Sequence, residues 1–272
     1  AGALASGGDE VHRAIMTTDT KEKCIFAEIE LSGKTVSICG IAKGSGMIHP
    51  NMATMLSYVV TDAAVSKEVL TAMQKKITHT TFNMVTVDGD TSTNDTATII
   101  ANGCAGNPII DKAEGEDYKT LYDAVYYVTE YLAKAIAADG EGATRLMEVD
   151  LIGAETEEQA RTCARSVASS SLVKAAIHGA DANWGRVLCA IGYSKANVDV
   201  SKIDVAFTSA AGTVAVCKNG AGITFSEELA KTILTEGEIT IDINLNSGSY
   251  SSTAWGCDLT YDYVKINGDY RT

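Results

Sequence analysis

The sequence predicts a mixed fold in which helices and strands form layers, and three observations carry that prediction. Residues 118–138 place apolar side chains at the three- and four-residue spacing of a helix. Residues 239–245 instead alternate isoleucine or leucine with polar residues, which is typical of a half-buried strand. Strand-like and helix-like stretches alternate along the whole chain, so we expect an α/β fold of mixed α+β layers.

The first strands follow from local signals. Residues 24–31 and 34–42 predict two strands, because Ser32-Gly33 between them is typical of a tight hairpin turn. The apolar run at 55–60 predicts a further strand. Near the C-terminus, residues 255–263 continue an alternation that predicts a strand antiparallel and adjacent to the one at 239–245.

Two helix starts can be read from capping residues. Ser66 is a good N-cap, so we expect a helix from there to about Thr78. Thr156 with Gln159 three residues later matches a capping box, which predicts a helix that ends near Ser169.

Composition and charge exclude several classes of function. The net charge of −13 argues against nucleic-acid binding, which needs a basic surface. No apolar run approaches the roughly 18–20 residues that cross a membrane. The seven cysteines form no CxxC pair, so we expect reduced thiols in a cytoplasmic protein rather than a zinc site or disulfides.

One segment stands out for its chemistry. Residues 43–57 place the small residue Ala53 directly before Thr54, after a glycine-rich approach and ahead of the expected strand. This order suits a chain that cuts itself at Ala53–Thr54 and then uses the freed threonine as a nucleophile. The new α-amine, with an unperturbed pKa of about 7.7–8.0, can accept the proton of the threonine hydroxyl.

This segment, taken as residues 42–56, resembles the self-cleavage site of the ornithine acetyltransferases, also called glutamate N-acetyltransferases, of arginine biosynthesis. Other segments agree with that family's motifs in the same order, namely 15–20, 82–83, 87–95, 140–144, 178–186 and 266–272. The resemblance implies the family's N-terminal-nucleophile fold with two lobes. We expect a cleavage-site lobe over residues 1–139 and a C-terminal lobe over 140–272.

The resemblance also implies an activity. A protein of this family transfers an acetyl group from N2-acetylornithine to glutamate. Thr54 takes the acetyl group in a first step and glutamate removes it in a second, after self-cleavage at Ala53–Thr54. Carried over residue by residue, the family's substrate-binding positions are Thr17, Lys43, Thr54, Glu141, Asn267 and Thr272.

Further expectations concern cofactors and partners. No cofactor and no metal are implied, although acetyl-CoA is a possible second acetyl donor. The acidic loop at 88–95 lacks the glycine and glutamate that a calcium loop needs. The two cleaved pieces are expected to stay together, as an α2β2 assembly. Family members carry an earlier segment whose Thr-Gly pair forms the oxyanion hole, so we expect this chain alone to have little transferase activity.

Two alternative functions and the role of one sequence stretch are left open by the sequence. The first is an alternative function as a related N-terminal-nucleophile aminopeptidase or amidase. The second is an inactive fragment that binds the segment it lacks. The third is the stretch 178–186, rich in His, Asp, Asn and Arg, for which we favour a structural role with Arg186 bridging loops. His49 lies close enough in sequence to the cut to influence it.

Overall fold

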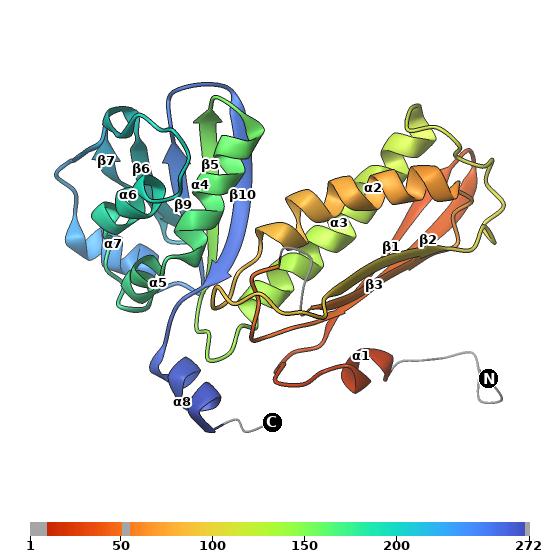
Figure 1. Cartoon of the computed structure of the whole chain (residues 1–272), viewed down its shortest axis with the longest axis horizontal. Helices are drawn as coiled ribbons and strands as arrows, with labels where there is room; N and C mark the ends of the chain where they lie inside the picture. Colours follow the sequence, from red (N-terminus) through yellow and green to blue (C-terminus); the bar gives the residue numbers. More distant parts are fainter. Residues whose placement is uncertain (1–9, 51–54, 270–272) are drawn as a thin grey trace.

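The computed structural model describes residues 10–50 and 55–269 of the 272-residue chain. Figure 1 shows an elongated molecule whose two sheets lie in different halves. The elements, in chain order, are α1 Val11–Ala14, β1 Lys23–Leu31, β2 Lys34–Lys43, β3 Leu56–Thr61, α2 Lys67–Thr80, η1 Phe82–Met84, β4 Thr96–Ala101, α3 Glu116–Ala138, β5 Leu146–Ala154, α4 Glu157–Ser169, α5 Ser171–His178, α6 Trp184–Gly192, η2 Val200–Lys202, β6 Asp204–Ser209, β7 Gly212–Lys218, β8 Ala221–Gly222, α7 Glu227–Leu234, β9 Glu238–Asn244, β10 Tyr250–Cys257 and α8 Tyr261–Asp269.

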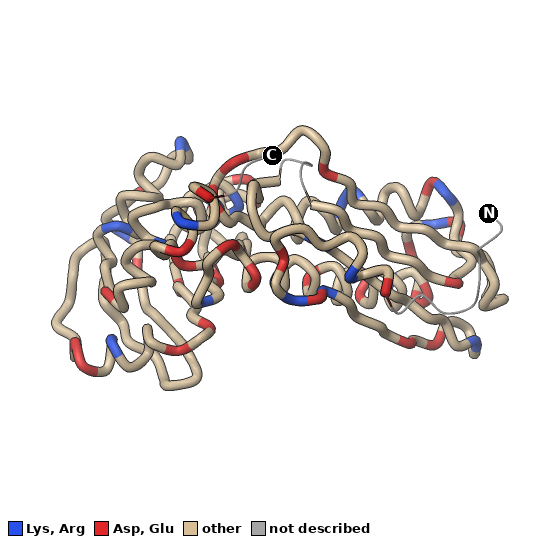
Figure 2. Tube along the Cα trace, turned by 90° about the horizontal axis from the view of Figure 1, so that it is seen from below, with Lys and Arg blue, Asp and Glu red and all other residues tan. Residues whose placement is uncertain are grey.

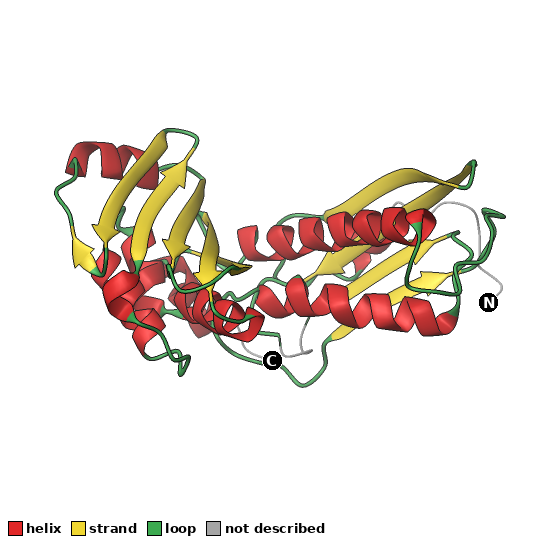
Figure 3. Cartoon of the chain, turned by 90° about the horizontal axis from the view of Figure 1, so that it is seen from above, coloured by secondary structure: helices red, strands yellow, loops and turns green. Residues whose placement is uncertain are grey.

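The first half is a sheet with the strand order β1-β2-β3-β4. The first three strands are antiparallel neighbours, whereas β3 and β4 run parallel. The helices α2 and α3 lie across one face of this sheet (Figure 3). Fully buried side chains of α3, among them Leu121, Val128 and Leu132, form the core beneath it, because helical spacing puts them on one stripe.

The second half is a sheet with the order β10-β5-β9-β6-β7-β8. Helix α4 packs against β5 and β10, and α7 packs against β6 and β7. The C-terminal part of α3 also belongs to this region, because α3 contacts β5 and β10 as well as β1 and β2. The connection from α3 to β5 therefore joins the two halves, and the proposed lobe boundary at 139/140 lies within it.

Most sequence predictions of secondary structure are confirmed. The hairpin turns at Ser32 and Gly33, whose φ angles of 48° and 72° are those of a left-handed two-residue turn. Ser66 caps α2 by accepting a hydrogen bond from the Val69 amide at 3.2 Å. Thr156 caps α4, and its hydroxyl accepts from the Gln159 amide at 3.1 Å. The mixed α/β fold class is confirmed as well.

The capping box at α4 differs in one contact. The Gln159 side-chain oxygen accepts its hydrogen bond from the Glu155 amide at 2.7 Å, rather than from the amide of Thr156 as the motif implies. The helix start is the same, because Thr156 still satisfies one of the free amides of the first turn.

Two predictions about the last strand are wrong. Strands β9 and β10 are not neighbours, because β5 lies between them and pairs with both. The predicted strand at 255–263 ends at Cys257, and Tyr261 begins α8. The physical reason lies in two side chains: Asp258 binds the Thr144 and Arg145 amides and turns the chain, while the Thr260 hydroxyl accepts from the Tyr263 amide and starts the helix.

The surface carries both signs of charge in both halves of the described chain, as the blue and red positions along the trace show (Figure 2). None of the helices in residues 10–50 and 55–269 is long and apolar enough to cross a membrane. All seven cysteines have free thiols.

Candidate active site

The site begins where β2 ends. Lys43, the last residue of β2, pairs with Leu56, the first residue of β3. The chain between them therefore leaves the sheet and returns to it at the same end of two neighbouring strands. This excursion contains the predicted cut, but Ala53 and Thr54 lie outside the described residues.

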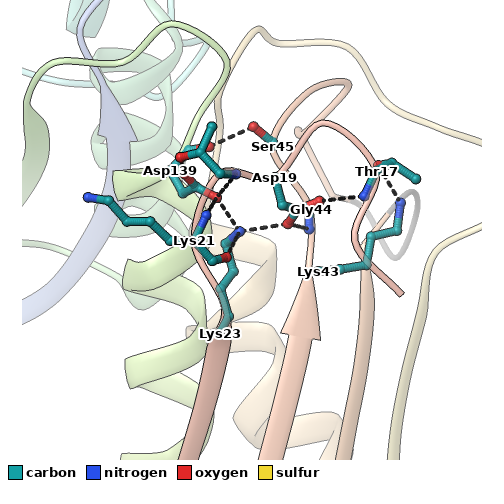
Figure 4. A network of polar contacts seen from close by, with 9 residues as sticks. Thr17, Asp19, Lys21, Lys23, Lys43, Gly44, Ser45 and Asp139 are labelled. Carbon is teal, nitrogen blue, oxygen red and sulfur yellow. Dashed lines mark hydrogen bonds and ion pairs between the residues drawn. The ribbon is translucent and has the colours of Figure 1, made fainter. Parts of the chain in front are cut away.

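A buried ion triad lies at the base of this excursion (Figure 4). The Lys23 ammonium donates to Asp19 and to Asp139, each at 2.6 Å, and all three side chains are at most 3% exposed. Burial acts to raise the pKa of Asp19, but hydrogen bonds from Gly44 and Lys23 outweigh it and hold the pKa below its usual value. The triad therefore joins the loop before β1, the strand β1 and the end of α3 at one buried point.

This triad positions Thr17 and Lys43. Asp19 accepts hydrogen bonds from the Gly44 amide at 2.7 Å and from the Thr17 amide at 3.2 Å. It thus joins the loop before β1 to the end of β2. The Lys43 ammonium then reaches the Thr17 hydroxyl at 3.5 Å (Figure 4). The structure brings these two predicted substrate-binding residues together.

Hydrogen bonds also link Asp139, one member of the triad, to the loop that contains Glu141. Asp139 ends the α3 region, and its carbonyl accepts from the Ser45 hydroxyl at 2.6 Å. The Glu141 amide in turn donates to the Ser45 carbonyl at 2.9 Å. Two hydrogen bonds of Ser45, one from its hydroxyl and one to its carbonyl, therefore hold the loop after α3 against the glycine-rich segment after β2.

The Glu141 side chain fits against Gly46 and contacts Asn267. A Cβ atom added at Gly46 would lie 2.3–2.4 Å from the Glu141 carboxyl group, so this carboxyl group occupies the space that a side chain at position 46 would take. The Asn267 amide of α8 donates to that carboxylate at 2.7 Å. These two predicted residues also meet, whereas the remaining one, Thr272, lies outside the described residues.

The surroundings of Glu141 are acidic. Burial and the carboxylates of Asp88, Asp90 and Glu141 raise the pKa of the Tyr263 hydroxyl. Asp88 holds the excursion itself, because it accepts from the amides of Met47 and Ile48 at 2.6 and 3.0 Å. The site therefore has a basic end at Lys43 and an acidic end at Glu141. Segment 43–46 connects them, because Glu141 binds Ser45 and lies against Gly46.

Arg165 binds the backbone of His49 and Pro50, shortly before the predicted cut. The Arg165 guanidinium donates to the carbonyls of Pro50 at 2.7 Å and of His49 at 3.3 Å. Burial, followed by the charge of Arg165, lowers the pKa of His49 to about 4, so its ring is neutral near pH 7. The ring nitrogen Nδ1 lies 3.1 Å from the Thr86 hydroxyl, which makes His49 a structural contact.

The stretch 178–186 lies in the second half and supports loops there. The His178 ring lies 3.0 Å from Asp258 rather than pairing with Asp181. Asn183 caps α6 by accepting from the Arg186 amide at 3.1 Å. The Arg186 guanidinium donates to the Leu172 carbonyl at 2.9 Å, which joins α6 to α5.

Sequence reasoning missed the ion triad. Asp19 and Lys23 are four residues apart, but Asp139 is more than a hundred residues away and no local pattern links it to them. The only signal is its place directly before the Gly-Glu-Gly motif at 140–142. Within the described ranges, no group of three or more His, Cys, Asp or Glu side chains could hold a metal ion.

Comparisons with known proteins identify the family of the chain. The model of the ArgJ family matches residues 1–272. The chain is 53% identical over 259 residues to the arginine biosynthesis bifunctional protein ArgJ 1 of Clostridium acetobutylicum, covering 95% of this chain and 63% of that protein. It is also 53% identical over 266 residues to the arginine biosynthesis bifunctional protein ArgJ of Caldanaerobacter subterraneus subsp. tengcongensis, covering 98% and 66%.

A solved structure is similar too. The crystal structure of the arginine biosynthesis bifunctional protein argJ from Bacillus halodurans has a TM-score of 0.76 and 46% identity, covering 80% of this chain and 100% of that chain. Our chain spans 63% and 66% of the length of the two curated relatives. A family model that matches from its first to its last residue, together with relatives that share half of its sequence, shows that this chain belongs to the ArgJ family.

Proposed function

We propose that this chain carries the nucleophile and most of the substrate site of an acetyltransferase that moves an acetyl group from N2-acetylornithine to glutamate in arginine biosynthesis. The observation that supports this most directly is the pairing of Lys43 with Thr17 and of Glu141 with Asn267. Both pairs are held to the short segment that leads to Ala53–Thr54. The relatives' printed names place them in arginine biosynthesis.

The two ends of the site match the charges of the substrates. N2-acetylornithine carries a carboxylate and a side-chain ammonium. We propose that the Lys43 ammonium binds the carboxylate and that Glu141, supported by Asn267, binds the ammonium. Because the chain has a net charge of −13, such local cations are needed to hold an anionic group.

The reaction proceeds by two acyl transfers through Thr54. After the cut at Ala53–Thr54, the free α-amine of Thr54 takes the proton of its own hydroxyl, and the oxygen attacks the acetyl carbonyl of N2-acetylornithine. Ornithine leaves with that proton, and Thr54 keeps the acetyl group as an ester. The amine of glutamate then attacks the ester, which gives N-acetylglutamate and restores the hydroxyl.

Other parts of the proposal rest on the family alone. They are the substrate-binding role of the C-terminal Thr272, acetyl-CoA as an alternative acetyl donor, an α2β2 assembly of the cleaved pieces, and a cytoplasmic location. The division into lobes at 139/140 is a proposal as well, and the two separate sheets support it.

The acetyl-enzyme provides the test of the first acyl transfer. The self-cut chain is incubated with N2-acetylornithine and no acceptor, digested, and analysed by mass spectrometry. We expect one acetyl ester on the peptide that begins at Thr54, removed by hydroxylamine and by added glutamate. Lys67, an exposed residue at the start of α2, gives a matched lysine peptide as an internal control for nonspecific acetylation.

The contradicting result is equally specific. A fully cut chain that never carries an acetyl ester on Thr54, even after long incubation, would exclude Thr54 as the acyl carrier. Acetylation that appears equally on the control lysine peptide would show chemical rather than enzymatic transfer.

A further inference from the structure

Helix α4 lines a pocket that the proposed acetyl transfer does not use. The pocket has a volume of about 330 Å³, which lies at the lower end of the range of small-molecule sites. Positions 162, 165, 166 and 169 of α4 all line it, because residues three and four apart share one face of a helix. His49, from the segment after β2, and Tyr193, directly after α6, complete the wall. The helix residues are Thr162, Arg165, Ser166 and Ser169.

Arg165 is the cation of this wall, and its hydrogen bonds to the protein use only part of its guanidinium group. Both hydrogen bonds that the group donates to described residues come from Nη2, to the carbonyls of His49 and Pro50. Its Nε is buried and has no partner in residues 10–50 and 55–269. A guanidinium carries five N–H groups, and buried donors without a partner are rare in folded proteins. Holding the backbone at 49–50 therefore does not account for the whole of this side chain.

The charge of Arg165 is not offset by a carboxylate within the described ranges. Arg165 makes no ion pair there, and the charge that acts on it is that of Arg161, one helical turn earlier. Burial, followed by this second positive charge, lowers the pKa of the Arg165 guanidinium. Arg161 itself lies 3.4 Å from the exposed Glu158 and donates to the His79 carbonyl. The pocket therefore has a local excess of positive charge in a chain whose net charge is −13.

The hydroxyl groups around Arg165 make the rest of the wall polar. The Thr162 hydroxyl donates to the exposed Glu158 at 3.2 Å, and the Ser166 hydroxyl donates to the Ala190 carbonyl at 2.7 Å. Tyr193 is 56% exposed, and its hydroxyl donates to no described residue. Since a hydroxyl can rotate to donate to a new acceptor, the wall combines a cation with adaptable donors. Oxyanions are bound by this combination of groups.

We propose that this pocket binds a phosphate group, with the Arg165 guanidinium as its main donor and the Tyr193 hydroxyl as a second one. The planar fork of an arginine matches the oxygens of a phosphate and donates two parallel hydrogen bonds to them. A phosphate fits better than a carboxylate, because it brings more negative charge and more acceptor oxygens to a wall with several hydroxyls. The role is separate from acetyl transfer, since none of the described substrate-binding residues lines the pocket.

The test is calorimetric titration of the purified chain with inorganic phosphate at low ionic strength, where charge interactions are least screened. We expect one saturable site. Arg165→Met should weaken binding by about 10- to 150-fold, the usual effect of losing a hydrogen bond to a charged group, and Tyr193→Phe should weaken it less. Arg13→Met is the matched control, because it removes the same charge from an exposed position and should leave the affinity unchanged.

A second variant fills the pocket and keeps Arg165, so the test stands even if Arg165→Met misfolds. Thr162→Glu places a carboxylate three residues before Arg165 on the same face of α4, where it should pair with the guanidinium and repel phosphate. We expect binding to weaken by about 10-fold or more with unchanged thermal stability. Thr162→Gln has nearly the same shape without the charge and should bind phosphate close to the wild-type affinity.

Adenosine diphosphate distinguishes the two sources of a phosphate group. Binding tighter than that of inorganic phosphate and lost in Thr162→Glu would identify a nucleotide-like ligand, whereas equal affinities would identify free phosphate, and either result supports the site. The inference is overturned if phosphate shows no saturable binding, or if folded Arg165→Met and Thr162→Glu bind it as the wild type does. None of these titrations requires self-cleavage or acetyl transfer, so that outcome leaves the proposed function intact.

Discussion

Replacing Lys23 with methionine is expected to lower the free energy of unfolding by about 3–5 kcal/mol, as the loss of one member of a buried ion pair typically does. The Lys23 ammonium is the cation between Asp19 and Asp139, at 2.6 Å from each. Methionine fills a similar volume but leaves both buried carboxylates without it. The measurement is chemical denaturation at neutral pH.

The controls separate charge from volume. Lys119→Met removes an exposed ion pair with Asp123 on α3 and should change stability little. Adding Asp19→Asn and Asp139→Asn to Lys23→Met should restore part of the loss, since the stranded charges are then gone. If Lys23→Met instead denatures at the wild-type midpoint, the triad does not anchor the site.

Glu141→Gln is expected to weaken binding of ornithine by about 10- to 150-fold, which corresponds to the 1.5–3 kcal/mol of a hydrogen bond to a charged group. Glutamine keeps the shape and the contact with Asn267 but loses the charge that attracts an ammonium. Calorimetric titration of the folded chain measures this without any need for turnover. Glu114→Gln, an exposed glutamate in the loop before α3, is the matched control.

A companion variant tests the geometry of the same contact. In Gly46→Ala the new methyl group would lie 2.3–2.4 Å from the Glu141 carboxyl group. That group is the end of a flexible side chain, so it should move and not unfold the protein. Weaker ornithine binding with unchanged stability is the expected result, with Gly237→Ala, where a Cβ has open space, as the control. Wild-type affinity in both Glu141→Gln and Gly46→Ala would exclude Glu141 from the substrate site.

Local sequence signals predicted the elements whose causes are themselves local. The β1–β2 hairpin depends on Ser32 and Gly33, which take left-handed φ angles, and α2 depends on the Ser66 cap. The prediction of a strand over 255–263 was wrong beyond Cys257. The alternating pattern continues there, but the amides of residues 144–145, from a loop distant in sequence, bind Asp258 and turn the chain. The position of β5 between β9 and β10 is likewise non-local, and periodicity carries no information about strand order.

In the candidate site, too, some residues could be found from the sequence and others depend on contacts between distant parts of the chain. The family resemblance implied Thr17, Lys43, Glu141 and Asn267 as substrate-binding residues, and in the structure they form two contacting pairs. The groups that position them were not predicted, because Lys23 and Asp139 meet only after α3 has packed on the sheet.

The proposed function requires the chain to cut itself at Ala53–Thr54 and so free a threonine nucleophile. The most direct test is the denaturing intact mass of the purified chain beside its Thr54→Ala variant. We expect two pieces from the wild type, residues 1–53 and 54–272 of the chain, and one uncut mass from the variant. A single 272-residue mass from both, or the same two pieces from both, would contradict the claim.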